Sequence, residues 1–207
     1  MELLTAYTAS GAPVKTAPRD ALLREIQQHS LREGDAPWSV RVVQLILFNS
    51  AGEIYVVRRG DKPENPNRLD KTVGGHVTAG ETFSSALCRE VQEEIGVDVV
   101  LCDHIGFRTA LREVDTTRLA VVRPVDYHPW MRSVRATNSG PSWIKRHNVV
   151  FYAGRYDGPV EFVDGEAIGM QLVSPAKLLS NIDADSSLYT DDLRVLLERY
   201  LTFYRNE

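Results

Sequence analysis

Residues 75–97 read GHVTAGETFSSALCREVQEEIGV, and both the architecture and the chemistry of this chain can be inferred outward from them. The first half of this stretch is rich in Gly, which is typical of a loop. Residues 82–95 contain neither Gly nor Pro and predict a helix. Gly96 follows the last apolar residue, at the place where a left-handed cap commonly ends a helix. The stretch therefore predicts a loop that leads directly into a helix.

Three carboxylates of the predicted helix share one face. Glu90, Glu93 and Glu94 stand at positions i, i+3 and i+4, which lie side by side on a helix. At about 100° per residue, Glu90 and Glu94 fall within the apolar arc and Glu93 lies at its edge, so the acids point toward the protein body. Arg89 offsets only part of their charge, and oxygen ligands at this density suit a hard divalent cation, Mg²⁺ or Mn²⁺. The alternative is an acidic, solvated face held by one pair with Arg89.

The same stretch resembles the signature of the Nudix hydrolases. Every fixed position of that signature is filled, by Gly75, Glu81, Arg89, Glu90, Val91, Glu93, Glu94, Gly96 and Val97. We call residues 75–97 the Nudix box. The resemblance implies an α/β/α sandwich around a mixed sheet, with a loop–helix–loop that binds Mg²⁺ or, in its place, Mn²⁺. It also implies a hydrolase that cleaves a diphosphate linkage in a nucleoside diphosphate derivative or a nucleoside di- or triphosphate.

The resemblance assigns metal ligands and a water-activating group to the box. Glu90, Glu93 and Glu94 would bind the metal together with the main-chain carbonyl of Gly75. The base that takes the proton of the attacking water would be a box glutamate, Glu93 or Glu90, or an acid from a distant loop. Both a box glutamate and a loop acid therefore stay candidates for the base.

Two further features follow from the resemblance. Arg89 and Glu81 would hold the loop and the helix of the box together. The loop acids that could serve as the base are Glu161, Asp164 and Glu166, of which Glu166 has the best position relative to the last predicted strand. For each of these acids, the alternative is an ordinary turn residue.

Basic and aromatic residues outside the box give further candidates for substrate contact. Arg58 and Arg59 end a predicted strand and could contact phosphates, or could simply mark a solvated strand end. Residues 145–147, Lys-Arg-His, precede another predicted strand and could likewise contact phosphates or simply face solvent. Trp130 and Trp143 could stack on a base, although such residues more often fill the edge of a core.

The composition bounds the class of protein. The chain has 207 residues, of which 43% are apolar and 25% charged, as expected for a soluble globular domain. The net charge of −4 argues against stable binding to nucleic acid but not against a nucleotide, and the resemblance implies a small-molecule diphosphate as the partner. Two cysteines and the lack of a run long enough for a membrane span favour a reducing cytoplasm.

The N-terminal part predicts an appended unit. Residues 3–8 and 13–16 predict a strand hairpin, and residues 18–30 predict a helix. This arrangement resembles the extension of Nudix proteins related to isopentenyl-diphosphate isomerase. We expect residues 1–38 to form this extension, with a packing role or as the contact of a homodimer, and residues 39–207 to form the Nudix domain.

The remaining elements are predicted from periodicity and turn signals. A long loop is expected over 122–142, and a last helix with one apolar stripe over 191–204. Strands are expected over residues 40–48, 53–58, 99–106, 107–120, 148–153, 160–162 and 171–173.

Rival functions stay open at this point. The isomerase resembles this chain near the box, but Gly74 stands where its catalytic Cys would lie. Residues 111–117 contain neither the Pro nor the Tyr that ADP-ribose and dinucleoside-polyphosphate hydrolases often place there, and the coenzyme A signature is missing upstream of the box. A non-catalytic nucleotide sensor would commonly have lost a box residue, whereas this chain retains all of them. Hydrolysis of a nucleoside di- or triphosphate is therefore favoured.

Overall fold

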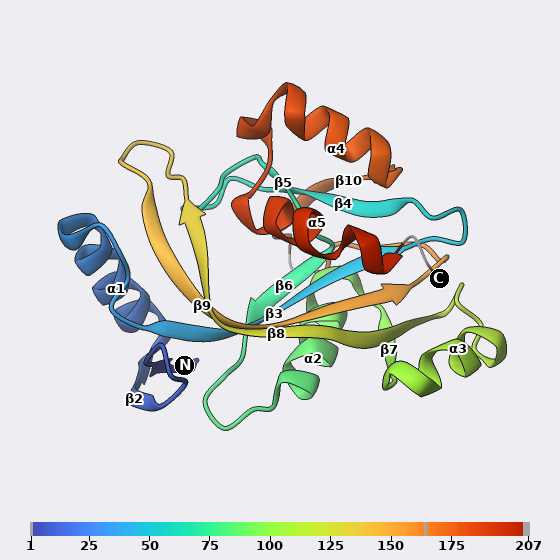
Figure 1. Cartoon of the computed structure of the whole chain (residues 1–207), viewed down its shortest axis with the longest axis horizontal. Helices are drawn as coiled ribbons and strands as arrows, with labels where there is room; N and C mark the ends of the chain where they lie inside the picture. The colour runs from blue at the N-terminus through green and yellow to red at the C-terminus, as the bar shows by residue number, and fades with distance from the viewer. Residues whose placement is uncertain (1, 164, 205–207) are drawn as a thin grey trace.

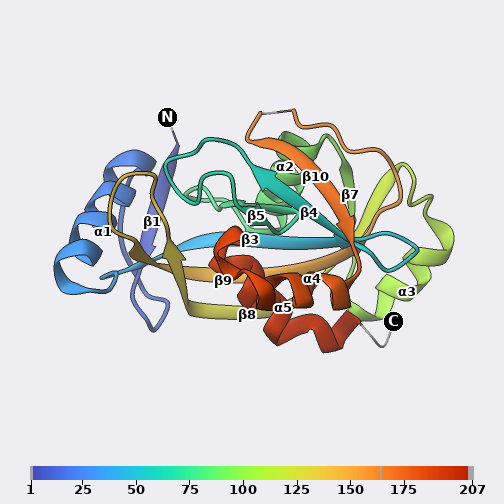
Figure 2. The same cartoon turned by 90° about the horizontal axis from the view of Figure 1, so that it is seen from above.

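The computed structural model describes residues 2–163 and 165–204, which form a curled mixed sheet with helices on both faces (Figures 1 and 2). The main strand order is β10-β4-β3-β9-β8-β7, with β1 and β6 added on β3, β2 on β1 and β5 on β4. The strands are β1 Leu3–Tyr7, β2 Pro13–Pro18, β3 Ser39–Phe48, β4 Ile54–Arg59, β5 Leu69–Asp70, β6 Val73–His76, β7 Asp98–Leu101, β8 Leu119–Arg135, β9 Trp143–Arg155 and β10 Ala167–Val173. The helices are α1 Arg19–Glu33, α2 Phe83–Ile95, α3 His104–Glu113, α4 Pro175–Ala184, the 3₁₀ turn η1 Ser186–Leu188 and α5 Asp191–Tyr204.

Strand β3 is the centre of the sheet. It pairs in parallel with β9 along its whole length, from Ser39 to Phe48. On its other side, β6 pairs with residues 42–45 of β3, whereas β4 meets β3 only at Phe48. Strands β4 and β6 therefore pair with different parts of the same side of β3.

Two apolar cores lie on opposite faces of this sheet. Alternation along β3 divides its side chains, because successive residues of a strand point to opposite faces. Val43, Leu45 and Leu47 pack with the buried face of α2. Val42 and Ile46 pack in the other core, to which α1, α4 and α5 all contribute. Figure 2 shows α2 on one side of the sheet and α4 and α5 on the other.

Three predicted elements were wrong. Residues 107–120 do not form one strand, because helix α3 occupies half of them. The helix begins after Asp103, whose side chain accepts a hydrogen bond from the Gly106 amide, so the strand predicted over 99–106 ends at Leu101. The predicted loop over 122–142 is mostly strand β8. Its register is interrupted after Pro124 and again between His128 and Met131, and these irregularities hide the alternation. Residues 160–162 form no regular strand in the described chain and pack irregularly beside α2.

The N-terminal hairpin and helix form as predicted, and the hairpin extends the sheet. Strand β1 pairs with β3, with Ala6 opposite Val40. Leu22 and Ile26 of α1 are fully buried in the same core as α5. The division of the chain near residue 38 stays a prediction. Among the described helices, none is both long and apolar enough to cross a membrane.

Candidate active site

The loop and helix of the Nudix box form as predicted. Thr82 caps α2 and exchanges hydrogen bonds with Ser85, while Gly96 ends the helix in the left-handed conformation at φ 67°. Leu87 and Val91 on one face of α2 are fully buried. The buried face fixes the rotation of the helix, so that the acidic residues next to it face the edge of β6.

Arg89 is the hub of the box. Its guanidinium donates to both carboxylate oxygens of Glu81, at 3.1 and 3.0 Å, and to the carbonyl oxygen of His76 at 2.9 Å. It also donates to Glu90 at 2.8 Å and to Glu93 at 3.0 Å. These acceptors raise the pKa of Arg89, the hydrogen bond with Glu81 contributing most. One side chain therefore joins the loop, β6 and α2.

The three box glutamates differ in exposure. Burial raises the pKa of the Glu90 carboxyl, although the nearby Arg89 acts in the opposite direction. Glu94 is half-buried, and its carboxylate accepts from the Gly74 amide at 3.4 Å. The Glu93 side chain is 55% exposed. Glu93 can therefore turn at little cost, whereas Glu90 is held against the strand.

The donor set fits a hard divalent cation. Among the described residues, no three His, Cys, Asp or Glu side chains are arranged to hold a metal together, and Arg89 engages both Glu90 and Glu93. The available donors are nevertheless oxygens alone, which Mg²⁺ and Mn²⁺ prefer. Gly75 leaves room for one of them, since a Cβ there would lie 1.9 Å from the carboxyl carbon of Glu90. The glycine therefore allows a carboxylate to rest directly against the β6 main chain.

We expect Gly75→Ala to weaken metal binding without unfolding the protein. The new methyl group would displace the Glu90 carboxylate, which lies at the far end of a side chain and can move without shifting the main chain. The dissociation constant for Mn²⁺, measured by titration, should rise about tenfold or more. Gly169→Ala is the control, because a Cβ at Gly169 would meet nothing within 4 Å. An unchanged Mn²⁺ affinity in Gly75→Ala would argue against Glu90 as a ligand.

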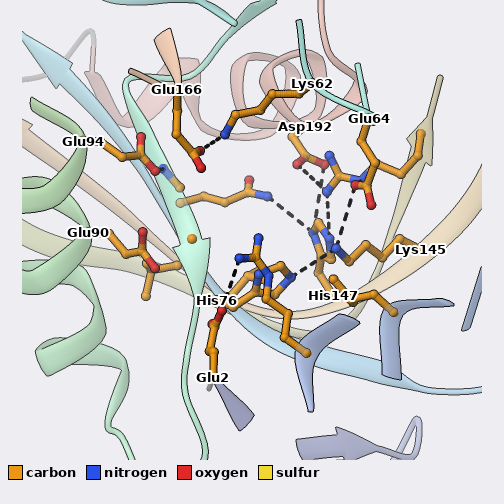
Figure 3. A pocket seen from close by; sticks show the side chains of 18 of the residues that line it. Glu2, Lys62, Glu64, His76, Glu90, Glu94, Lys145, His147, Glu166 and Asp192 are labelled. Atoms are coloured by element: carbon orange, nitrogen blue, oxygen red, sulfur yellow. Dashed lines mark hydrogen bonds and ion pairs between the residues drawn. The ribbon is translucent and has the colours of Figure 1, made fainter. Parts of the chain in front are cut away.

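A cleft of about 1150 Å³ runs from the box to the opposite face of the sheet. Figure 3 shows Glu90 and Glu94 at one side, and Lys145, His147 and Asp192 at the other. We call these two regions the box end and the inner end. Lys62 and Glu166 form an ion pair along the wall between them. Helix α1 also lines the cleft.

The predicted basic residues lie in different places. Arg59 lines the cleft and pairs with Asp70 at 3.1 Å, whereas Arg58 is exposed and donates to the Asn67 carbonyl. Of residues 145–147, Lys145 and His147 face the inner end, and Arg146 pairs with Asp35 outside it. The structure therefore brings one member of the Arg58–Arg59 pair to the cleft.

Of the predicted aromatic and acidic candidates, too, some line the cleft and others lie outside it. Trp143 is buried in the core and lines the cleft, whereas Trp130 lies beside the Arg146 guanidinium. Glu166 lines the cleft and Glu161 is not among its lining residues. Asp164 lies outside the described residues.

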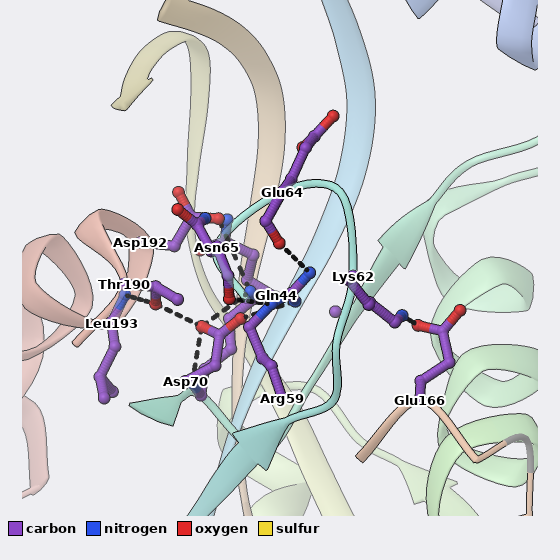
Figure 4. Close-up of polar contacts among 12 residues, drawn as sticks. Gln44, Arg59, Lys62, Glu64, Asn65, Asp70, Glu166, Thr190, Asp192 and Leu193 are labelled. Carbon is purple, nitrogen blue, oxygen red and sulfur yellow. Dashed lines mark hydrogen bonds and ion pairs between the residues drawn. The ribbon is translucent and has the colours of Figure 1, made fainter. Parts of the chain in front are cut away.

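Sequence reasoning missed a buried polar network beneath the inner end. Asp192, at the start of α5, accepts from Ser133 at 2.5 Å and from Arg135 at 3.1 Å. Asp70 accepts from Thr190 at 2.6 Å, as Figure 4 shows. The missed signal is alternation: on β3, β8 and β9, polar residues occupy positions that point toward the apolar core. These residues are Gln44, Ser133 and Arg135, together with Lys145 and His147, which the sequence had indicated only as candidates for phosphate contact; all five are buried.

The charges of this network shift the pKa values of its members. Burial acts to raise the pKa of Asp192, but Arg135 and Lys71 outweigh it, so the pKa lies well below its usual range. Burial lowers the pKa of Lys145 to about 8, although Glu64 acts in the opposite direction. His147 stays neutral because burial lowers its pKa well below 6.5. The network is therefore an ion-paired floor of the cleft.

The chain belongs to the Nudix family, because the family model described as "NUDIX domain" matches residues 38–193. A Nudix hydrolase of Deinococcus radiodurans is 46% identical over 61 residues, which span 29% of this chain and 36% of that protein. The matched region is thus about a third of that relative's length.

Two solved structures share the fold. A Deinococcus radiodurans protein has a TM-score of 0.64 at 24% identity, over 96% of this chain and 98% of its own. The Nudix domain of Shewanella oneidensis NrtR, solved in complex with ADP ribose, has a TM-score of 0.52 at 11% identity, over 80% of this chain and 88% of its own.

Proposed function

We propose that this protein is a divalent-metal-dependent hydrolase that cleaves the diphosphate linkage of a nucleoside di- or triphosphate or of a nucleoside diphosphate derivative. The observation that carries the proposal is the complete Nudix box, whose acidic face lines a large cleft that also contains buried cations. Family membership and the nucleotide ligand of the Shewanella structure support a nucleotide substrate. Nudix hydrolases generally use divalent metal ions.

In this proposal, Glu90, Glu93, Glu94 and the carbonyl of Gly75 hold Mg²⁺ or Mn²⁺ at the box end. The metal would neutralise phosphate charge and lower the pKa of a bound water. Arg89 orients Glu90 and Glu93 by hydrogen bonds from one guanidinium. The wall of the cleft keeps the diphosphate in place between the box and the cations of the inner end.

The base stays open between the box and the loop. Glu93 is the most exposed box glutamate, and turning away from Arg89 would free its carboxylate. Glu166 lies on the cleft wall, where it pairs with Lys62, and its carboxylate is the loop candidate for accepting the proton. Glu166→Gln and Glu93→Gln would separate these assignments through their pH–rate profiles.

The structure adds an argument against the isomerase alternative. A Cβ at Gly74 would lie 2.3 Å from the Lys71 side chain. A catalytic thiol at position 74 would therefore require this buried lysine to move. Lys71 is fixed by Asp70 at 3.3 Å and Asp192 at 3.6 Å, so a functional Cys does not fit this arrangement.

A substrate panel tests the proposed function. Nucleoside di- and triphosphates, nucleoside diphosphate sugars and isopentenyl diphosphate are each incubated with the protein in Mg²⁺ or in excess chelator. Nucleoside monophosphate, phosphate and diphosphate are measured for the nucleotides, and conversion of isopentenyl diphosphate to its isomer is followed separately. We expect Mg²⁺-dependent hydrolysis of at least one nucleotide, faster at alkaline pH because water must lose a proton, and no isomerisation. Full turnover in chelator, or no hydrolysis of any nucleotide, would contradict the proposal.

A further inference from the structure

The inner end of the cleft presents hydrogen-bond donors that have no acceptors in the described protein. Lys145 is 3% exposed, and its ammonium group carries three protons. One of them is donated to His76 Nε2 at 3.1 Å. The nearest carboxylate oxygen, on Glu64, is 3.9 Å away, beyond hydrogen-bond distance. Two protons of a buried ammonium therefore lack acceptors among the described residues.

Gln44 presents a second donor. Arg135 Nη2 lies 2.9 Å from His147 Nε2, and a guanidinium can only donate, so Nε2 is unprotonated and the Nδ1 of the neutral ring carries the proton. The structure places Gln44 Nε2 3.5 Å from that Nδ1, and the Oε1 of the same amide has no partner among the described residues. Because a protonated Nδ1 needs an acceptor, we infer that the Gln44 amide is turned over, with its oxygen toward Nδ1 and its NH₂ group where Oε1 is placed.

Arg135 provides a third donor on a third strand. Its Nε makes no hydrogen bond within the described chain and lies 3.4 Å from Glu64. Glu64 is thus shared by Arg135 and Lys145, as Asp192 is shared by Arg135 and Lys71. The network contains four cations and three carboxylates: Arg59, Lys71, Arg135 and Lys145 against Glu64, Asp70 and Asp192.

A purely structural network would leave neither an excess charge nor unpaired donors. Buried polar groups in folded proteins nearly always have partners, and an undercompensated buried charge is strongly unfavourable. The donors of Lys145, Gln44 and Arg135 come from β9, β3 and β8, and all three residues line the cleft. The missing partner is therefore an oxygen-rich anion that enters through the cleft.

We propose that the inner end is a phosphate-binding subsite, formed by Lys145, Gln44 and Arg135, that holds a phosphate of the substrate other than those at the box end. Three donors on separate strands suit a phosphate, which offers three terminal oxygens, better than a carboxylate. The proposal rests on the proposed function for its choice of substrate. It predicts selection for nucleotides that carry a phosphate beyond the cleaved linkage.

Titration of the metal-free protein with inorganic phosphate tests the subsite directly. We expect calorimetry to show phosphate binding by wild type, with the affinity lowered at least about tenfold in Lys145→Met. Acetate should bind more weakly than phosphate. Lys177→Met, which removes an exposed lysine of α4, is the matched control and should bind as wild type does. Lys145→Arg, which keeps the charge, should retain most of the affinity even if Lys145→Met lowers stability.

The outcomes separate this proposal from the proposed function. Glu94→Gln should lose turnover and keep phosphate binding, because it alters only the box end. If wild type hydrolyses nucleotides but does not bind phosphate in chelator, or if Lys145→Met binds it as tightly as wild type, the subsite is refuted while the hydrolase assignment stands. If Lys145→Met lowers kcat/KM equally for substrates with and without the additional phosphate, the lysine instead contacts the cleaved linkage, and the proposal fails.

Discussion

Glu94→Gln should abolish most turnover without destabilising the metal-free protein. The Glu94 carboxylate accepts a long hydrogen bond from the Gly74 amide, which the Gln oxygen can also accept, and the hydrogen bonds of Arg89 to Glu81, Glu90 and Glu93 do not involve Glu94. The substitution therefore removes one negative charge and leaves the Arg89 hub intact. If Glu94 binds the metal, we expect a loss of about 3 kcal/mol of transition-state stabilisation, or about two orders of magnitude in rate.

Thermal melts with chelator and with Mg²⁺ separate the roles of Glu94. At a hundredfold excess of Mg²⁺ over its dissociation constant, wild type should gain about 2.7 kcal/mol by mass action, and Glu94→Gln should lose much of that gain. Glu113→Gln, at an exposed position of α3, should behave as wild type throughout. A lower melting temperature in chelator together with an undiminished response to Mg²⁺ would mean that Glu94 is structural.

Asp192→Asn should cause the largest loss of stability. Asp192 is 1% exposed and accepts from Ser133 and Arg135, with Lys71 at 3.6 Å. Removing its charge leaves buried cations without compensation, which costs about 3–5 kcal/mol and should lower the melting temperature by about 10 °C. Asp183→Asn, at an exposed position of α4, is the control. A change below about 1 kcal/mol in denaturant unfolding would show that the network is not structural.

The pH dependence of this loss follows from the depressed pKa of Asp192. A carboxyl with a lower pKa in the folded state contributes fully at pH values above its unfolded pKa, about 3.9. The contribution is lost as the pH falls from there toward the folded pKa. The stability difference between wild type and Asp192→Asn should therefore be constant near neutral pH and shrink below about pH 4.

The parts of the fold that the sequence could predict are those set by local signals. Helix α2 carries a cap at Thr82, a glycine stop at Gly96 and an apolar stripe, and all of these lie within the helix or next to it. By contrast, α3 depends on the Asp103 cap, and its only buried residue is Phe107. In β8, prolines and two register shifts remove the alternation that marks a strand.

The box end could be predicted as a group of residues, whereas Arg59, Lys145, His147 and Glu166, which also line the cleft, were indicated only one by one. The spacing of Glu90, Glu93 and Glu94 placed them on one face, because helical periodicity operates over a few residues. The inner end joins residues that lie far apart in sequence, such as Lys145 with His76 and Arg135 with Asp192. Such contacts follow from strand order and helix docking, which no local pattern specifies.

The first turn of α5 closes the floor of the cleft, although it follows the Nudix box and the strands of the sheet in the sequence. Domains commonly begin to fold from the N-terminus while they are being synthesised. During synthesis, Arg135 and Lys71 would have to remain without Asp192 until α5 emerges from the ribosome. The nascent chain can therefore form the box and most of the sheet early, but it acquires its complete cleft only once α5 has been made. A premature stop just before α5 would release a chain with an intact Nudix box and a cleft without its floor.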